Sequence, residues 1–271
     1  GGNDTINGEA GNDSINGEAG NDTIIYAMEG GADNVNGGAD NDQLNVITNV
    51  LADDTLDVIV TGGVVTSIEG GSVTSVETIN VNLGGGNDTI SYAGSAGGVT
   101  VNLGVPSGTG LASLANTENV TGTDQVDILT GSNGDNVLNG GAGADTITGG
   151  GGNDTINGGA GGDTLIGGIG SDIINTGAAD DNVVDLIRFS NAVEFGDTIN
   201  NFDADGTVDR VEFGGTLNTL FDNGTNDDNI QFVSGNGANG GNIAANMGIS
   251  EALFLDGNNG EGVTNANLGN A

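Results

Sequence analysis

The chain has 271 residues, with 38 acidic side chains against only two basic ones, so its formal net charge is −36. A nucleic-acid-binding protein needs clustered Lys and Arg to contact phosphates, and this composition excludes such a protein. The same charge is repelled by acidic lipid surfaces. His and Cys are absent, which excludes imidazole acid–base chemistry, disulfides, and zinc sites built on either residue.

Glycine contributes 55 residues, whereas aromatic residues make up only 3% of the chain. No three-residue glycine period is present, so the chain is not collagen-like. So few aromatic side chains cannot build a conventional thick core. Composition alone favours disorder, because a highly charged chain with few large apolar groups rarely offsets the entropy lost on folding. The alternative is a repeat fold that binds cations. No run approaches about 18 consecutive apolar residues, so we expect no transmembrane segment.

The first stretch, residues 1–45, repeats a short pattern in which an Asp precedes an aliphatic residue by two positions. The spacing is nine residues at first and resumes after a two-residue insertion. The Asp residues of this block are Asp4, Asp13, Asp22, Asp33 and Asp42.

Residues 46–121 have a different character, since they are rich in Val, Ile and Thr and are interrupted at pairs of glycines. This composition predicts strands, and no helical period persists. One lone copy of the repeat, GGNDTIS, places Asp88 within this region. Two alternatives stay open: the solenoid continues through irregular coils without acidic turns, or a separate β-rich insert lies between two repeat blocks.

Residues 122–184 contain seven consecutive nine-residue units that hold phase without a gap. The eighth position is always Leu, Ile or Val. The sixth position is occupied in turn by Asp127, Asn136, Asp145, Asp154, Asp163, Asp172 and Asp181.

Each position of the repeat has a physical role. Glycine at positions one, two and four permits backbone angles that a Cβ would forbid and allows close approach of successive turns. Three residues then extend as a short strand whose aliphatic side chain points inward. Two units form one flattened coil of 18 residues, so each Asp lies above the Asp 18 positions earlier. The pairs expected on this basis are Asp127 with Asp145, Asp145 with Asp163, Asp154 with Asp172, and Asp163 with Asp181.

Stacked carboxylates at about 4.8 Å repel each other by roughly 1 kcal/mol per pair even in water-like surroundings. Neither repeat block contains Lys or Arg, so the compensating cation must come from solution. Carboxylate and carbonyl oxygens are hard ligands that suit Ca²⁺ better than Mg²⁺, which demands a strict octahedron. The column of Asp residues therefore predicts several bound calcium ions.

The units GGAGADTIT, GGGGNDTIN, GGAGGDTLI and GGIGSDIIN resemble the nonapeptide GGxGxDxUx of the RTX family of secreted bacterial proteins. This resemblance implies an all-β fold, a right-handed parallel β-roll, with Ca²⁺ held in the turns. It also implies type I secretion in an unfolded state and folding in extracellular calcium. The resemblance implies backbone carbonyl ligands at positions one and three, which here are Gly140, Ala142, Gly149, Gly151, Gly158, Ala160, Gly167 and Ile169.

Residues 185–271 differ from the repeats, since all seven Phe and both Arg lie beyond residue 184. An open solenoid end exposes unpaired strands, so we expect an aromatic-containing capping region here, with Arg188 and Arg210 paired to local carboxylates. Within it, residues 201–212 match the spacing of an EF-hand loop, with oxygen ligands at Asp203, Asp205, Asp209 and Glu212. An ordinary acidic turn is the alternative, because the flanking segments are typical of strands.

No serine-hydrolase, zinc-protease or nucleotide-binding motif occurs, so we expect no enzyme activity. We interpret the chain as a fragment of a larger secreted, extracellular or cell-surface bacterial protein. Its expected role is that of a calcium-dependent structural segment of the adhesin or surface-layer type. The alternatives are an export and folding module of a secreted protease, lipase or epimerase, and an ice- or polysaccharide-binding module. Candidate partners besides calcium are cell-surface polysaccharide and neighbouring subunits of a surface array.

Overall fold

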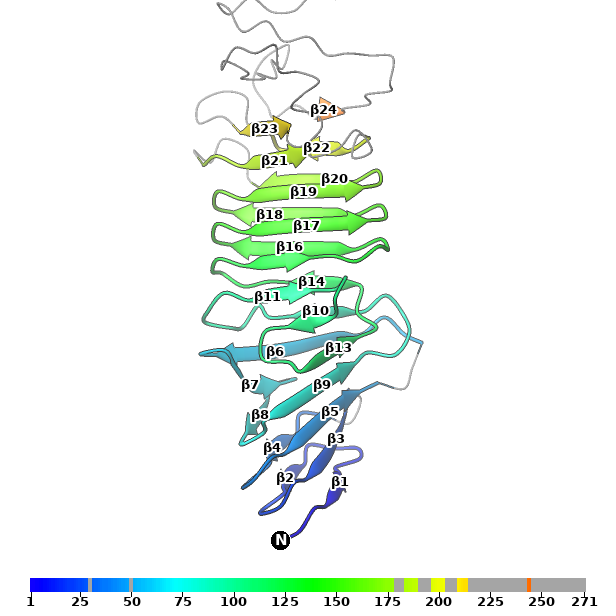
Figure 1. The fold of residues 1–271 in the computed structure, drawn as a ribbon, viewed down its shortest axis with the longest axis vertical. Coiled ribbons are helices and arrows are strands. Elements are labelled where there is room, and N and C mark those ends of the chain that lie inside the picture. The colour runs from blue at the N-terminus through cyan, green and yellow to red at the C-terminus, as the bar shows by residue number, and fades with distance from the viewer. Residues whose placement is uncertain are drawn as a thin grey trace, which may run out of the picture.

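The computed structural model describes residues 1–28, 31–48, 51–177, 183–189, 196–202, 209–213 and 243–244. These residues form strands and turns that stack into one elongated solenoid, with the N-terminus at one end (Figure 1). Within these ranges no helix has the length and apolar composition needed to cross a bilayer. The prediction of an all-β parallel β-roll is confirmed.

One face of the N-terminal half is a five-stranded sheet in which every neighbouring pair is parallel. In spatial order its strands are β1 (Thr5–Asn7), β3 (Thr23–Ala27), β5 (Gln43–Ile47), β9 (Thr78–Asn82) and β13 (Ser113–Ala115).

The opposite face is a twelve-stranded sheet that continues along the whole solenoid. Its neighbours are parallel except where β6, β7 and β8 fold back on one another and where β24 joins β22. In spatial order its strands are β2 (Ser14–Asn16), β4 (Asn34–Asn36), β8 (Gly71–Thr74), β7 (Val64–Ile68), β6 (Thr55–Thr61), β10 (Thr89–Ser91), β14 (Asn119–Thr121), β16 (Val137–Ala142), β18 (Thr155–Ala160), β20 (Ile173–Gly177), β22 (Thr198–Asn200) and β24 (Ile243–Ala244).

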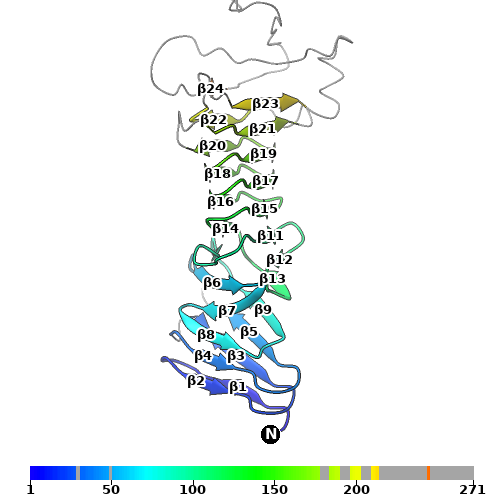
Figure 2. The ribbon, with the colours of Figure 1, turned by 90° about the vertical axis from the view of Figure 1, so that its left-hand side faces the viewer.

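A seven-stranded sheet faces the twelve-stranded one in the C-terminal half, and Figure 2 shows the two columns of strands side by side. Only the short β12 pairs in the antiparallel direction. In spatial order its strands are β12 (Ser107–Gly108), β11 (Thr100–Asn102), β15 (Ile128–Thr130), β17 (Thr146–Gly151), β19 (Thr164–Ile169), β21 (Leu186–Phe189) and β23 (Arg210–Phe213).

The core of the main repeats is a thin stack of aliphatic side chains. Strand pairing places Ile147 beside Leu165 on one face and Leu138 beside Ile156 on the other, each pair 18 residues apart. All four side chains are fully buried. The strands are longer than the three residues expected, because the ladder continues through the following glycines and pairs Gly141 with Gly159. The backbone therefore supplies much of the contact between coils.

The strands between residues 55 and 121 join the same sheets as the repeats. Strand β9 lies between β5 and β13, and strand β10 lies between β6 and β14. Tyr92 of this region is fully buried, as is Tyr26 on β3 of the first repeat block. Hydrogen-bonded pairing thus runs from the N-terminal strands into the main repeats.

Glycine at position two of the repeat is required both by conformation and by space. Gly159 has φ +113°, a region that residues with a side chain rarely adopt. A Cβ on Gly159 would also press against the carbonyl oxygen of Gly141, one coil earlier. Both constraints come from the close stacking of coils.

We predict that Gly159→Ala destabilises the roll by about 1–3 kcal/mol or more, because it adds backbone strain and a steric clash. Gly97→Ala is the matched control, since a Cβ on Gly97 would meet no atom within 4 Å and its φ is not positive. Urea unfolding in calcium measures both variants. Equal stability of the two variants would contradict the stacking described.

Candidate metal sites along the two coil edges

The Asp residues of the repeat form a hydrogen-bonded ladder along each edge of the roll. The backbone N–H of Asp127 donates to Oδ1 of Asp145 at 2.8 Å, and that of Asp145 donates to Oδ1 of Asp163 at 2.8 Å. On the other edge the N–H of Asp154 donates to Oδ1 of Asp172 at 2.8 Å. These five side chains are at most 2% exposed. Three of the four predicted pairs are confirmed.

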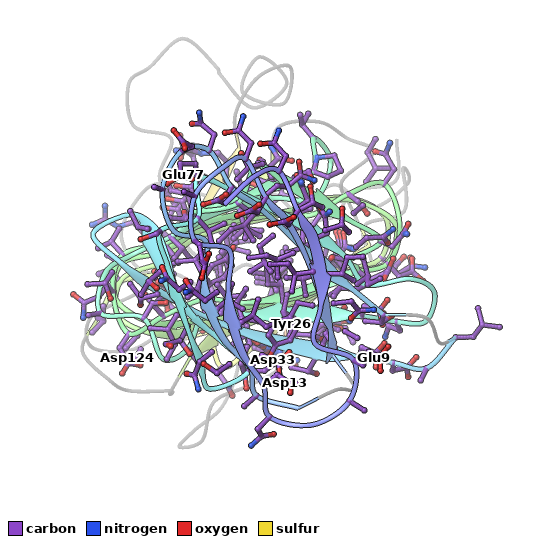
Figure 3. All side chains as sticks on the ribbon, turned by 90° about the horizontal axis from the view of Figure 1, so that it is seen from below. Glu9, Asp13, Tyr26, Asp33, Glu77 and Asp124 are labelled. Atoms are coloured by element: carbon purple, nitrogen blue, oxygen red, sulfur yellow. The ribbon has the colours of Figure 1, made fainter. Side chains whose placement is uncertain are left out.

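The N-terminal block has the same ladders. The N–H of Asp4 donates to Asp22, and that of Asp22 donates to Asp42, each at 2.8 Å. On the opposite edge, the N–H of Asp13 donates to Asp33 at 2.9 Å. Seen along the solenoid axis, Asp13 and Asp33 lie together on one side of the core, and Glu77 lies on the other (Figure 3).

The second carboxylate oxygen, Oδ2, is buried and accepts no hydrogen bond in many of these residues. A buried anionic oxygen without a partner is costly, and such groups in proteins are paired or bind metals. The residues that carry such an oxygen include Asp13, Asp22, Asp42, Asp54, Asp88, Asp145, Asp154 and Asp172.

A small space that only a glycine leaves open, here called a cradle, lies beside position-one glycines such as Gly140 and Gly149, next to one of these oxygens. A Cβ on Gly140 would lie closer than 3.0 Å to both Oδ2 of Asp145 and the carbonyl oxygen of Gly158. Gly149 is surrounded in the same way by Asp154 and the carbonyl of Gly167. Position one has no positive φ, so glycine is needed here for space. The absent side chain leaves two oxygens from consecutive coils facing one point.

This donor set fits Ca²⁺. Among the described residues no three acidic side chains gather at one point, so each site combines carboxylate with backbone carbonyl oxygen. These hard donors, together with the unpartnered Oδ2 atoms, match calcium coordination.

The position-three carbonyls also have a structural role. The carbonyl of Ala160 accepts the N–H of Gly143 at 2.7 Å, and that of Ile169 accepts the N–H of Gly152 at 2.9 Å. These bonds join consecutive coils. Each oxygen keeps a second lone pair for a metal. Ala142 and Gly151, the corresponding residues of the earlier units, end strands β16 and β17.

Burial raises the pKa of some of the ladder carboxylates. Burial raises the pKa of Asp145 to about 6 and that of Asp154 to about 7, although hydrogen bonds from the preceding coil act in the opposite direction. The negative charges of Asp127 and Asp172 respectively add to the increase. Burial also raises the pKa of Asp88. The site therefore favours a bound cation or proton.

Asp127 differs from the predicted ligands because protein groups already bind both of its oxygens. Its Oδ2 accepts the N–H of Thr123 at 2.6 Å, and its Oδ1 accepts the N–H of Val99 at 2.6 Å. The Thr123 hydroxyl lies 3.1 Å from both oxygens. Thr123 replaces the position-two glycine, and its N–H turns toward the carboxylate.

Asn136 is satisfied in a similar way on the other edge. Its Oδ1 accepts the N–H of Ser132 at 2.6 Å, and its Nδ2 donates to the carbonyl of Glu118 at 2.6 Å. Ser132 again stands at position two. In the first coil of the main array, residues 122–139, protein groups therefore already make hydrogen bonds to the position-six side chain on both edges.

The pairing of Asp163 with Asp181 stays a prediction, because Asp181 lies outside the described residues. The N–H of Asp163 donates to Oδ1 of Asp185 at 2.7 Å, and these two residues are 22 positions apart instead of 18. Both ladders continue toward the C-terminal end of the solenoid. The N–H of Asp172 donates to Asp197, and that of Asp185 donates to Asp209, both at 2.9 Å.

Two of the EF-hand candidates, Asp203 and Asp205, lie outside the described residues, so the loop at 201–212 stays a prediction. Of the other two, Asp209 directly precedes β23 and is buried on the ladder. Glu212 is exposed on β23 and accepts hydrogen bonds from Arg188 at 2.8 and 2.9 Å. The expected local pairing of Arg188 is confirmed.

Sequence reasoning missed three ladder residues, Asp54, Asp185 and Asp197. The N–H of Asp54 donates to Oδ1 of Asp88 at 2.8 Å. Each missed Asp precedes an aliphatic residue by two positions, and this remnant of the repeat could have identified them. Glu77 and Glu118 also act in the ladders, since they accept the N–H groups of Asp42 and Asp88 at 2.8 and 2.9 Å.

The raised pKa values predict an unusual pH dependence without calcium. The folded state holds protons on Asp145 and Asp154 more tightly than the unfolded chain, in which their pKa is near 3.8. This stabilisation is therefore present in acid and is lost as the pH rises through about 6 to 7.

We expect circular dichroism in chelator to show more β structure at acidic than at alkaline pH. The double variant Asp145→Asn, Asp154→Asn should show a weaker dependence. A β signal in the parent chain that increases with pH would contradict the assignment.

The hydrogen bonds from Thr123 to Asp127 predict a stability effect that does not involve calcium. Thr123→Val removes a hydroxyl that contacts a buried carboxylate, so it should destabilise the chain by about 1.5–3 kcal/mol. The number of bound calcium ions should stay unchanged. Thr121→Val on β14 is the control. Calorimetric calcium titration and urea unfolding test both statements, and a lost calcium ion in Thr123→Val would refute them.

Comparison with known proteins agrees with this geometry. The family model of the RTX calcium-binding nonapeptide repeat matches four stretches, residues 1–26, 29–45, 121–156 and 148–183. No curated protein matches the chain significantly. The matched stretches contain the ladders of both blocks, whereas Asp54, Asp88, Asp185 and Asp197 lie outside them. The repeats of this chain are RTX repeats that bind calcium ions, and the chain is a calcium-binding repeat module of the kind found in secreted proteins.

Proposed function

We propose that the chain is a calcium-dependent structural segment of a secreted bacterial cell-surface protein, of the adhesin or surface-layer type. The observation that carries this proposal is the repetition, along both edges, of a buried Oδ2 without a hydrogen bond. A bound Ca²⁺ supplies the positive charge and the coordination that these oxygens lack. The segment acts as a stiff spacer, and it works outside the cell, where calcium is abundant.

The proposed ligands combine the carboxylates of the ladders with the carbonyls of the cradles. Asp127 is omitted, because protein donors occupy both of its oxygens, and Asp54 is added. The carboxylate ligands are Asp4, Asp13, Asp22, Asp33, Asp42, Asp54, Asp88, Asp145, Asp154, Asp163 and Asp172. The carbonyl ligands are Gly140, Ala142, Gly149, Gly151, Gly158, Ala160, Gly167 and Ile169.

Calcium is needed because the core is thin. One buried aliphatic side chain per nine-residue unit contributes roughly 1.5–3 kcal/mol, whereas ordering each residue of that unit costs about 1–2 kcal/mol. Parallel ladder hydrogen bonds offset only part of the difference, since each contributes about 1 kcal/mol net. The buried carboxylates add a further electrostatic cost, which a divalent cation removes.

The proposed roles of the segments follow from the positions of the Asp ladders along the chain. Residues 1–45 and 122–184 are the two main calcium-binding blocks, residues 46–121 connect them and contribute Asp54 and Asp88, and residues 185–271 cap the array. The sheets that run from β1 to β23 through the connecting strands support a continuous rod. This continuity favours a structural segment over an export tail with a single compact repeat block.

A charge-matched pair of variants tests the proposal. Asp145→Asn keeps the Oδ1 that accepts the N–H of Asp127 but loses the anionic Oδ2, so it should remove at least one calcium ion and raise the calcium concentration needed for folding. Asp124→Asn removes the same charge from an exposed side chain and should change neither quantity. Calorimetry and circular dichroism in a calcium titration measure both. Unchanged calcium binding in Asp145→Asn would refute the proposed site.

A further inference from the structure

Several Asn residues of the chain directly precede a glycine, and such pairs are prone to lose the side-chain amide. The backbone nitrogen of the glycine attacks Cγ of the Asn, ammonia leaves, and water opens the resulting succinimide ring to Asp or isoaspartate. Glycine favours the attack because it has no side chain and turns freely. The Asn–Gly pairs within the described ranges are Asn7–Gly8, Asn16–Gly17, Asn36–Gly37, Asn133–Gly134, Asn139–Gly140 and Asn157–Gly158.

In four of these pairs the side-chain amide is held in a ladder between coils. On the outer face of the twelve-stranded sheet, Nδ2 of Asn157 donates to Oδ1 of Asn139 at 2.5 Å, and Nδ2 of Asn175 donates to Oδ1 of Asn157 at 2.6 Å. In the N-terminal block, Nδ2 of Asn36 donates to Oδ1 of Asn16 at 3.0 Å. These amide ladders fix the group that would be attacked.

The backbone nitrogens that would attack are restrained as well. The N–H of Gly17 donates to the carbonyl of Asn36 at 2.9 Å, and that of Gly37 makes the same kind of bond to the next coil at 3.0 Å. Gly140 and Gly158 lie inside the paired strands β16 and β18. All four glycines are buried, and a Cβ on any of them would lie closer than 3.0 Å to a carbonyl oxygen of the next coil. The backbone therefore has no room to turn toward the side chain.

The other two pairs lack this protection. Asn133 and Gly134 are both exposed in the loop between β15 and β16. Asn7 is exposed, and its neighbour in the next coil is Ile25, whose side chain cannot hydrogen-bond an amide. The fold thus divides pairs of identical sequence into four shielded pairs and two open ones.

We propose that the four shielded pairs, at Asn16, Asn36, Asn139 and Asn157, are sites of spontaneous deamidation that react while the chain is unfolded, and that their reaction prevents the roll from forming. Isoaspartate carries its Cβ in the main chain, so the position-one glycine that follows cannot keep its register with the next coil. Conversion of Asn157 to Asp would place an oxygen against Oδ1 of Asn139, where an N–H donor had been.

A chain that stays unfolded for long therefore loses its ability to fold, whereas a folded chain preserves it. The inference goes beyond the proposed function, because it compares the folded with the unfolded state whichever ion stabilises the fold.

The first test is peptide mapping by mass spectrometry during incubation of the full chain at alkaline pH, where the backbone nitrogen loses its proton more readily. One sample is kept folded in calcium and the other unfolded in urea. The four shielded pairs should react at least about tenfold more slowly in the folded sample, because reaction there requires local opening. The open pair Asn133–Gly134 should react at similar rates in both samples. Equal rates for the shielded pairs in the two samples would overturn the inference.

Asn175 is the matched control within the same ladder. It occupies the same position of the repeat as Asn157 but precedes Thr176, whose side chain obstructs the backbone nitrogen. In urea it should stay intact while Asn157 reacts. Equal reaction of the two residues in urea would contradict the role given to glycine.

Refolding is the second test. Samples aged in urea are diluted into calcium, and the recovered β signal is measured by circular dichroism against that of fresh samples. The parent chain should lose refolding in step with reaction of the four pairs. The quadruple variant Asn16→Thr, Asn36→Thr, Asn139→Thr, Asn157→Thr should keep it. Thr is a suitable replacement because Thr148 stands at the same position of the repeat, directly before Gly149.

Separation of the aged parent chain by size exclusion gives the same information without a variant. Isoaspartate at the four sites should be concentrated in the fraction that does not refold. Complete refolding of aged parent chains in which the four sites have reacted would overturn the inference, as would an equal loss of refolding in the quadruple variant.

Discussion

The structure depends on one hydrogen bond, which runs from the backbone N–H of an Asp to the carboxylate of the Asp one coil later. This bond fixes the spacing between coils and places each carboxylate under the next turn. It satisfies Oδ1 but leaves Oδ2 buried and facing a glycine cradle. The interaction that stacks the coils thus also leaves a buried anionic oxygen that requires a positive charge.

The need for a bound calcium ion differs from one part of the solenoid to another. In the first coil of the main array, Thr123 and Ser132 donate to Asp127 and Asn136, and no cation is required there. In the connecting region, Glu77 and Glu118 accept ladder N–H groups with longer side chains, and Tyr92 is fully buried. Asp54 and Asp88 of the same region nevertheless keep a buried Oδ2 that accepts no hydrogen bond. The need for positive charge therefore extends from the two repeat blocks into the region that connects them.

The same physical chemistry relates the module to its surroundings. A chain with so few basic and aromatic residues gains little from collapse, and mutual repulsion of its carboxylates opposes folding when calcium is scarce. Where calcium is abundant, the repulsion is replaced by coordination. This behaviour suits a calcium-binding repeat module of the kind found in secreted proteins.

The sequence by itself determined the β-roll, the two repeat blocks, the identity of the cation and most Asp pairs, because a strict nine-residue period dictates the stacking register wherever no residue is inserted. Only the tertiary structure decided the partners where coil length changes, as when the N–H of Asp163 donates to Asp185, 22 residues later. It also showed that the N–H of Thr123 donates to Asp127, and that Glu212 pairs with Arg188. These outcomes depend on where an inserted loop returns to the sheet and on which donor lies nearest in space, and neither is encoded in the local spacing of residues.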